Sequence, residues 1–230
     1  MVKWGGDCLN TGCVPSKTLI ASAHAMEHIN TASSFGVNVG PSHLDYTTVH
    51  SRVHEIISEI APHDSVERYR KLGIDVYEEY AEFIDGHTIR LLNHVISARR
   101  IVIATGSSPR VPTIDGVECA HVYTSDTIWE RKTLPNNLVV IGAGPIGSEL
   151  AMAYAQLGST VHLVESSTRL LGILPKDQAE IVVAALKRRG VILHYNTSVS
   201  RISEHHVSIG YQEVKADAVL IATGREPNTA

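Results

Sequence analysis

Hydrophobic residues recur at every third or fourth position through the first part of the chain. This spacing predicts one helix over 15–30 and a second over 49–60, where Asp45 precedes the hydrophobic stripe and is a favourable N-cap. A short third helix is expected over 66–71, ending at Gly73. The chain is therefore expected to begin with a group of amphipathic helices.

From residue 74 the hydrophobic period changes from helical to alternating. The alternation predicts short strands over 74–80, 81–84, 88–92 and 95–98. The dipeptide Asp85-Gly86 separates two of these runs and favours a hairpin turn. Residues 101–104 are all apolar, which is typical of a strand buried on both faces of a parallel sheet.

The second half of the chain alternates between apolar runs and helical stripes. Strands are expected over 138–141, 160–165, 191–195 and 218–222, with short strands near 199–209 and helices over 146–157 and 177–189. This order is typical of a doubly wound α/β unit. The run Leu-Pro-Asn-Asn over 134–137 is the best linker candidate, and it divides the chain into residues 1–134 and 135–230.

One internal repeat links the two halves. The sequence Ile-Val-Ile-Ala-Thr-Gly over 101–106 recurs as Val-Leu-Ile-Ala-Thr-Gly over 219–224, and each copy leads into a loop that contains proline. Two related nucleotide-binding halves would explain the repeat. Two similar but unrelated buried strands remain the alternative.

Composition narrows the class of protein. Hydrophobic residues make up 43% of the 230 residues and charged residues 19%, which is typical of a folded globular chain. The net charge is −4, so there is no basic stripe for a nucleic-acid backbone. The apolar runs are too short for a membrane span, and the first twenty residues lack the apolar core of a signal peptide. With three cysteines, the composition favours a cytoplasmic protein whose cysteines serve redox chemistry.

Residues 142–147 read Gly-Ala-Gly-Pro-Ile-Gly, a dinucleotide-binding pattern placed between an expected strand and an expected helix. Gly142 would allow the tight turn, Gly144 the approach of a pyrophosphate, and Gly147 close packing of helix on strand. Glu165 ends the following strand, where a carboxylate holds a ribose 2′-hydroxyl and repels a 2′-phosphate. NAD(H) is therefore favoured over NADP(H), although Arg169 lies near. A glycine-rich turn without a ligand is the alternative.

Two cysteines lie five residues apart near the start of the chain. Cys8 and Cys13 can form a disulfide only if the chain bends between them, and Gly12 permits such a bend. Cys13 would then lie at a helix N-terminus near Lys17, and both features lower a thiol pKa. Two unpaired buried cysteines remain the alternative.

The whole segment 5–17, Gly-Gly-Asp-Cys-Leu-Asn-Thr-Gly-Cys-Val-Pro-Ser-Lys, resembles the redox-active segment of the flavin-dependent pyridine nucleotide–disulfide oxidoreductases. That family includes dihydrolipoamide dehydrogenase, mercuric reductase and glutathione reductase. The two Ala-Thr-Gly strand ends and the glycine-rich turn occur in the family's order. Ser16, Lys17 and Glu165 resemble the dihydrolipoamide dehydrogenase and mercuric reductase branch.

The resemblance implies an α/β fold with two related Rossmann-like three-layer domains. Residues 1–134 would be a partial FAD-binding domain with the redox-active disulfide, and 135–230 an NAD(P)-binding domain whose end, from about 222, returns towards the first. It also implies that hydride passes from NADH through FAD to a Cys8–Cys13 disulfide and on to a dithiol or disulfide substrate. Cys13 would face the flavin and Cys8 would exchange with substrate.

The resemblance further implies a set of cofactor contacts. Lys17 and Glu149 match a pair near the reactive flavin edge. The remaining cofactor-binding candidates are Gly6, Gly12, Thr105, Gly106, Gly142, Gly144, Pro145, Ile146, Gly147, Glu165, Gly224 and Arg225. In the family the full-length enzyme is a homodimer.

Parts of the family pattern do not occur in the sequence. The family's first glycine-rich FAD fingerprint is missing ahead of Cys8, and so is its C-terminal dimerisation domain, so the chain is expected to be a truncated member that binds FAD poorly. Dihydrolipoamide is the leading substrate and mercuric ion the second. Three further classes stay open, namely an inactive NAD-binding fragment, a flavin-free thiol-exchange protein and a zinc hydrolase using His24 and His28.

Overall fold

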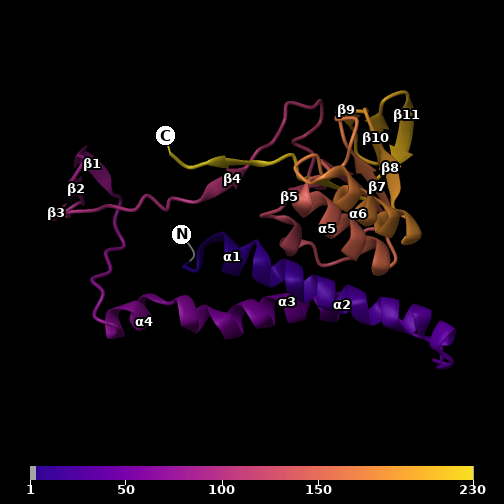
Figure 1. Ribbon diagram of the computed structural model, residues 1–230, viewed down its shortest axis with the longest axis horizontal. Coiled ribbons are helices and arrows are strands. Elements are labelled where there is room, and N and C mark those ends of the chain that lie inside the picture. Colours follow the sequence, from indigo (N-terminus) through magenta and orange to yellow (C-terminus); the bar gives the residue numbers. More distant parts are fainter. Residues whose placement is uncertain (1–3, 230) are drawn as a thin grey trace.

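The computed structural model describes residues 4–229 and shows a mixed α/β arrangement (Figure 1). The first part is helical. Its elements are α1 (Gly6–Asn10), α2 (Cys13–Thr31), the 3₁₀ turn η1 (Ala32–Phe35), α3 (Tyr46–Ile60), η2 (Ala61–Asp64) and α4 (Val66–Lys71). The three predicted helices are therefore confirmed. In Figure 1, α2 and α3 lie along each other beneath the parallel sheet.

Local sequence explains where α3 begins. The Asp45 carboxylate accepts hydrogen bonds from the Thr47 and Thr48 amides at 3.0 and 3.3 Å. These bonds satisfy amides that have no partner within the helix. The buried face of α3 then packs on α2 through Val49 and Val53.

A three-stranded antiparallel sheet follows the helices. It consists of β1 (Glu82–Asp85), β2 (Thr88–Arg90) and β3 (Val95–Ser97), in the order β1-β2-β3. The hairpin turn at 85–86 is confirmed, since β1 and β2 pair antiparallel around it. Figure 1 shows this small sheet standing away from the larger one, connected by extended segments.

Two strand predictions in this region are wrong. Residues 74–80 are irregular, and residues 101–104 form no strand although all four are apolar. Val102 is 87% exposed and Ile103 64% exposed. A buried parallel strand requires a neighbouring strand on each side, and within residues 4–229 no strand pairs with this segment.

The larger sheet is parallel and has five strands in the order β5-β12-β6-β7-β8. The strands are β5 (Val122–Thr124), β6 (Asn137–Ile141), β7 (Thr160–Val164), β8 (Ile192–His194) and β12 (Ala218–Ile221). Helices α5 (Pro145–Gln156) and α6 (Lys176–Arg188) connect its strands, and the 3₁₀ turn η3 (Ile128–Glu130) follows β5. The predicted βαβ alternation is confirmed. The sheet also takes in β5, which lies before the predicted boundary at residue 134.

The side-chain period of two places a core on each face of this sheet. From β6, Leu138 and Val140 join the core formed with α2, α3 and α5, whereas Val139 and Ile141 join a second core on the other face. That second face is covered by the antiparallel sheet β9 (Val199–Ile202), β10 (His206–Ile209) and β11 (Gln212–Lys215). The five-stranded sheet is therefore the middle layer of three and is covered on both faces.

No helix among residues 4–229 has the length and hydropathy needed to cross a lipid bilayer.

Candidate functional site

Two glycines of the 142–147 turn are required by the backbone around them. Gly142 has φ +100°, and a Cβ there would lie 2.4 Å from the Ala222 carbonyl oxygen. A Cβ on Gly147 would lie 1.9 Å from the Gly142 carbonyl oxygen. Gly144, by contrast, borders open space and is the N-cap of α5. The turn is therefore closely packed at Gly142 and Gly147 and open to solvent at Gly144.

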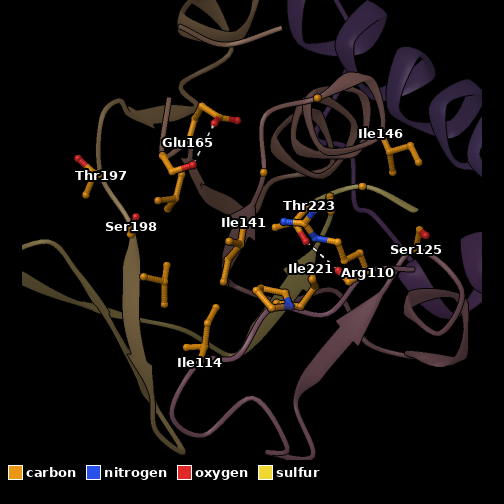
Figure 2. Close-up of a pocket in the computed structure, with 18 of the residues that line it drawn as sticks. Arg110, Ile114, Ser125, Ile141, Ile146, Glu165, Thr197, Ser198, Ile221 and Thr223 are labelled. Carbon is orange, nitrogen blue, oxygen red and sulfur yellow. Dashed lines mark hydrogen bonds between the residues drawn. The ribbon is translucent and has the colours of Figure 1, made fainter. Parts of the chain in front are cut away.

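The open side of the turn faces a cavity of about 530 Å³ at the carboxyl ends of β6, β7 and β12. Figure 2 shows Glu165 on one side of the cavity, Ile141 and Ile221 in the middle, and Arg110 and Ser125 on the other side. The first turn of α5 contributes Pro145 and Ile146 to the wall. Since the first amides of a helix lack partners within it, this end of α5 is suited to an anionic group.

Glu165 joins the glycine-rich turn to the end of β7. Its carboxylate accepts hydrogen bonds from the Ala143 amide at 2.9 Å and the Ser167 amide at 2.8 Å. Partial burial raises the pKa of Glu165, but the hydrogen bonds from these amides outweigh burial and hold the pKa below its ordinary value. The carboxylate is therefore ionised at neutral pH.

The two cysteines lie on either side of a sharp bend between α1 and α2. The Thr11 and Gly12 amides both donate to the Asp7 carbonyl, at 2.9 and 2.6 Å. Cys13 is the first residue of α2, as predicted. Both cysteines are exposed free thiols in the structure, and the half-buried Cys119 is a free thiol too. The hydrogen bond with the Cys13 side chain, with a smaller effect of slight desolvation and of the charge of Cys13, raises the pKa of Cys8.

Lys17 and Glu149 form an ion pair between α2 and α5. The Lys17 Nζ lies 2.5 Å from the Glu149 carboxylate, and both side chains remain about half exposed. Lys17 lies one helical turn after Cys13. The pair therefore places a positive charge near the cysteines, held by a carboxylate from α5.

Arg225 connects the two ends of the chain. Its guanidinium lies 2.8 Å from the carboxylates of both Asp7 and Asp126, and it donates to the hydroxyls of Ser107 and Ser125. Burial lowers the pKa of Arg225, but the hydrogen bonds and charges of Asp126 and Asp7 outweigh it and hold the pKa above its ordinary value. Asp7, which directly precedes Cys8, is thus held against Arg225 in the C-terminal segment.

The two copies of the sequence repeat meet in space. Beyond them, β4 (Ser107–Pro109) pairs antiparallel with β13 (Arg225–Pro227), and Ser108 lies opposite Glu226. The side chain of Thr105 donates to the Asn228 carbonyl, and that of Thr223 donates to the Arg110 carbonyl. Each threonine thus hydrogen-bonds an equivalent position in the other copy, namely the residue directly after the proline of its loop. The segments that follow the two copies therefore form a locally symmetric two-stranded ribbon.

The cysteines, Lys17, Glu149 and Arg225 border one further cavity of about 440 Å³. Its wall also contains Trp129, whose indole Nε1 donates to the carbonyl of Thr11 at 2.8 Å. Ser125 and Ile146 belong to the walls of both cavities. The cysteine cavity and the cavity of the glycine-rich turn are therefore neighbours.

The structure thus brings together most of the predicted site residues. Around the cysteine cavity lie Cys8, Gly12, Cys13, Lys17, Ile146, Glu149 and Arg225, and around the other lie Gly142, Gly144, Pro145, Ile146, Glu165 and Gly224. Among the described residues, Gly6, Thr105, Gly106 and Gly147 lie outside both walls.

Sequence reasoning left the role of Ser107 open and missed three further residues around Arg225, namely Asp7, Ser125 and Asp126. Asp7 and Arg225 are 218 positions apart, so no local pattern could connect them. The available signal was that Asp7 adjoins a cysteine and Ser107 follows one copy of the repeat.

The structure does not support a zinc centre at His24 and His28. The carboxylate of Glu27, which belongs to the same pattern, is bound by Arg189 at 2.7 and 3.0 Å. Nor do any three histidine, cysteine or acidic side chains within residues 4–229 form a group able to hold a metal.

Comparison with known proteins agrees with this arrangement. The chain is 34% identical over 234 residues to a mercuric reductase from Lysinibacillus sphaericus and 31% identical over 235 residues to a dihydrolipoyl dehydrogenase from Chlamydia pneumoniae, in each case across 98% of its own length. It matches the solved structure of the HOCl-induced flavoprotein disulfide reductase RclA from Escherichia coli with a TM-score of 0.82 and 32% identity, across 100% of its own length.

The chain spans about half the length of these relatives, covering 43%, 50% and 50% of them respectively. The family model described as pyridine nucleotide-disulphide oxidoreductase matches residues 1–230. The chain therefore belongs to the pyridine nucleotide-disulphide oxidoreductase family.

Proposed function

We propose that the chain carries the thiol and dinucleotide parts of a flavin-dependent NAD(P)H:disulfide oxidoreductase. The observation that carries this proposal is the adjacency of the two cavities, one bordered by the cysteine pair and the other by the glycine-rich turn. Electrons taken from a dinucleotide in one cavity would have only a short distance to travel to the thiols in the other.

The residues around the larger cavity fit a nicotinamide dinucleotide. Gly144 leaves open space where a pyrophosphate would approach, and the start of α5 presents its amides there. The ionised carboxylate of Glu165 lies at the edge of the same cavity. It favours a ribose hydroxyl and repels a 2′-phosphate, so we propose NAD(H) as the dinucleotide.

The residues around the cysteine cavity fit the reactive part of a flavin. The cavity is lined by the apolar side chains of Ile146, Leu150 and Trp129, and by the ion pair of Lys17 with Glu149. A bound flavin supplies the two-electron chemistry that links a dinucleotide to a disulfide. The Lys17 ammonium would stabilise negative charge at this place, and Glu149 fixes its position.

The two thiols have different positions and therefore different proposed roles. Cys13 is the first residue of α2, one helical turn before Lys17, and it borders the cavity proposed for the flavin. Cys8 lies on α1, with a raised pKa caused first by its hydrogen bond with Cys13. We propose that Cys13 is the thiol that faces the flavin and that Cys8 exchanges with a substrate disulfide or dithiol.

A dithiol such as dihydrolipoamide is the proposed substrate, and mercuric ion is the second candidate. Relatives named for both reactions match the chain at similar identity. An exposed pair of thiols suits either, because both a disulfide and a soft metal ion react with thiolates. For the whole protein we propose a homodimer.

Thiol counting tests the proposed function directly. The chain is oxidised in air, freed of oxidant and mixed anaerobically with NADH and a large excess of FAD. We expect two new thiols per chain, and none in the Cys8→Ser variant. If an added dithiol reduces the Cys8–Cys13 disulfide by exchange and NADH with FAD does not, the chain is a flavin-free exchange protein. Absence of new thiols with NADH and FAD in the unsubstituted chain would refute the proposal.

A further inference from the structure

Two histidines on α3 and one main-chain oxygen converge outside the site described above. His50 and His54 are separated by one helical turn, and their Nε2 atoms lie 3.2 Å apart. The Nε2 atom of His54 is also 3.1 Å from the carbonyl oxygen of Trp129 on η3. The Nε2 atom of His54 therefore lies close both to a second ring nitrogen and to a main-chain oxygen.

Hydrogen bonding within the protein satisfies this arrangement only in part. A ring nitrogen that donates its proton to the carbonyl cannot at the same time accept one from the other ring. Imidazole binds a metal ion through a ring nitrogen that carries no proton, and a bound cation would remove this competition for protons between the two rings.

The spacing of the two nitrogens matches that of two ligands on one metal ion. With metal–nitrogen bonds of about 2.0–2.1 Å, nitrogens at this separation subtend an angle of roughly 100° at the metal. That angle suits tetrahedral coordination and lies near the octahedral value. The Trp129 carbonyl, at a similar distance from His54, is placed for a third position.

We propose that His50, His54 and the carbonyl of Trp129 form a binding site for a borderline divalent cation of the zinc, nickel or copper class. Imidazole is a ligand that these ions prefer, whereas magnesium and calcium prefer a shell of oxygens. His54 is exposed and His50 half-buried, so solvent can reach the site and supply further ligands. The positive charge of Lys132 acts on His50 and would weaken binding.

The proposed cation would fasten α3 to η3 beside the redox cavity. Trp129 is buried, its ring borders the cysteine cavity, and its indole nitrogen donates to the carbonyls of Thr11 and Ser125. Thr11 lies between the two cysteines. A cation bound at His50 and His54 would therefore fix Trp129, whose indole nitrogen hydrogen-bonds the bend between the cysteines.

Calorimetry with ZnCl₂ tests the proposal on the 230-residue chain. Thiols are first capped with iodoacetamide, so that Cys8, Cys13 and Cys119 cannot bind the metal. We expect saturable binding at one dominant site, weakened in both His50→Ala and His54→Ala. Each substitution should lower the zinc affinity by at least about 10-fold. Removing even a hydrogen-bond partner of a metal ligand lowers affinity by roughly this factor.

The matched control is the double variant His24→Ala/His28→Ala, which removes a pair of the same spacing from α2. It is expected to bind zinc as the unsubstituted chain does. Alanine favours helix at both places, and circular dichroism checks that each variant is folded. Proton NMR should show the ring signals of His50 and His54 shifting during the zinc titration. Absence of binding, or equal loss in the control and in the α3 variants, would overturn the proposal.

Discussion

At the scale of single residues, the glycine-rich turn separates a structural requirement from a binding one. Gly147→Ala would place a methyl group against the Gly142 carbonyl, whereas Gly144→Ala would place it in open space. We expect Gly147→Ala to lower the free energy of unfolding by about 1–3 kcal/mol or more. Gly144→Ala should keep the fold and weaken NADH binding.

Urea unfolding and fluorescence titration with NADH distinguish these two effects. Unchanged NADH affinity in Gly144→Ala, or unchanged stability in Gly147→Ala, would show that the two glycines do not have these separate roles.

Glu165 gives a prediction about pH. Its pKa in the folded chain is depressed, so its contribution to stability is present above the ordinary value of 4.5 and is lost as the pH falls through the folded value. We expect Glu165→Gln to be about 1 kcal/mol less stable at pH 7, since hydrogen bonds to a charged acceptor are weakened. The difference should shrink as the pH falls below 4.5. Urea unfolding of both chains between pH 7 and pH 3 checks this, and a difference that grows with acidity would contradict it.

At the scale of elements, the Arg225 contacts hold β13, β4 and the α1 segment together. Replacing Arg225 by Met removes the partner of two carboxylates while keeping an apolar side chain of similar length. Because the Arg225 side chain is only 21% exposed, we expect a loss of about 1–3 kcal/mol in the free energy of unfolding. The control is Lys176→Met, which breaks the exposed pair of Lys176 with Glu180. That change should alter stability by less than about 0.5 kcal/mol.

Equal effects of the two substitutions in urea unfolding would mean that the Arg225 contacts add little to stability.

The same elements show what the sequence could and could not predict. Helix α3 was predictable because its cap, Asp45, and its hydrophobic stripe are both local. The segment 101–104 was predicted as a strand because its apolar run is also local, but whether a strand forms depends on neighbours elsewhere in the chain. The glycine-rich turn was also predictable, because its signal lies within six consecutive residues, 142–147. The contact of Asp7 with Arg225 depends on the whole fold and leaves no local pattern.

At the scale of the whole molecule, the stability of the chain should reside in the parallel sheet and not in the apolar segment 101–104. Leu220 is fully buried in β12, whereas Ile103 is 64% exposed. We expect Leu220→Ala to lower the free energy of unfolding by about 2–5 kcal/mol. Ile103→Ala should change it by less than about 0.5 kcal/mol. A large effect of Ile103→Ala in urea unfolding would show that this segment is paired in solution.

The proposed function requires that Cys13 and the dinucleotide turn share one redox site. The anaerobic absorption spectrum of the Cys8→Ser chain, recorded in the presence of excess FAD beside that of Cys13→Ser, tests the first part of this requirement. A thiolate close to a flavin gives a long-wavelength charge-transfer band, and we expect that band in Cys8→Ser and not in Cys13→Ser. The same spectrum from both variants in the presence of excess FAD would mean that Cys13 does not face a flavin in this chain.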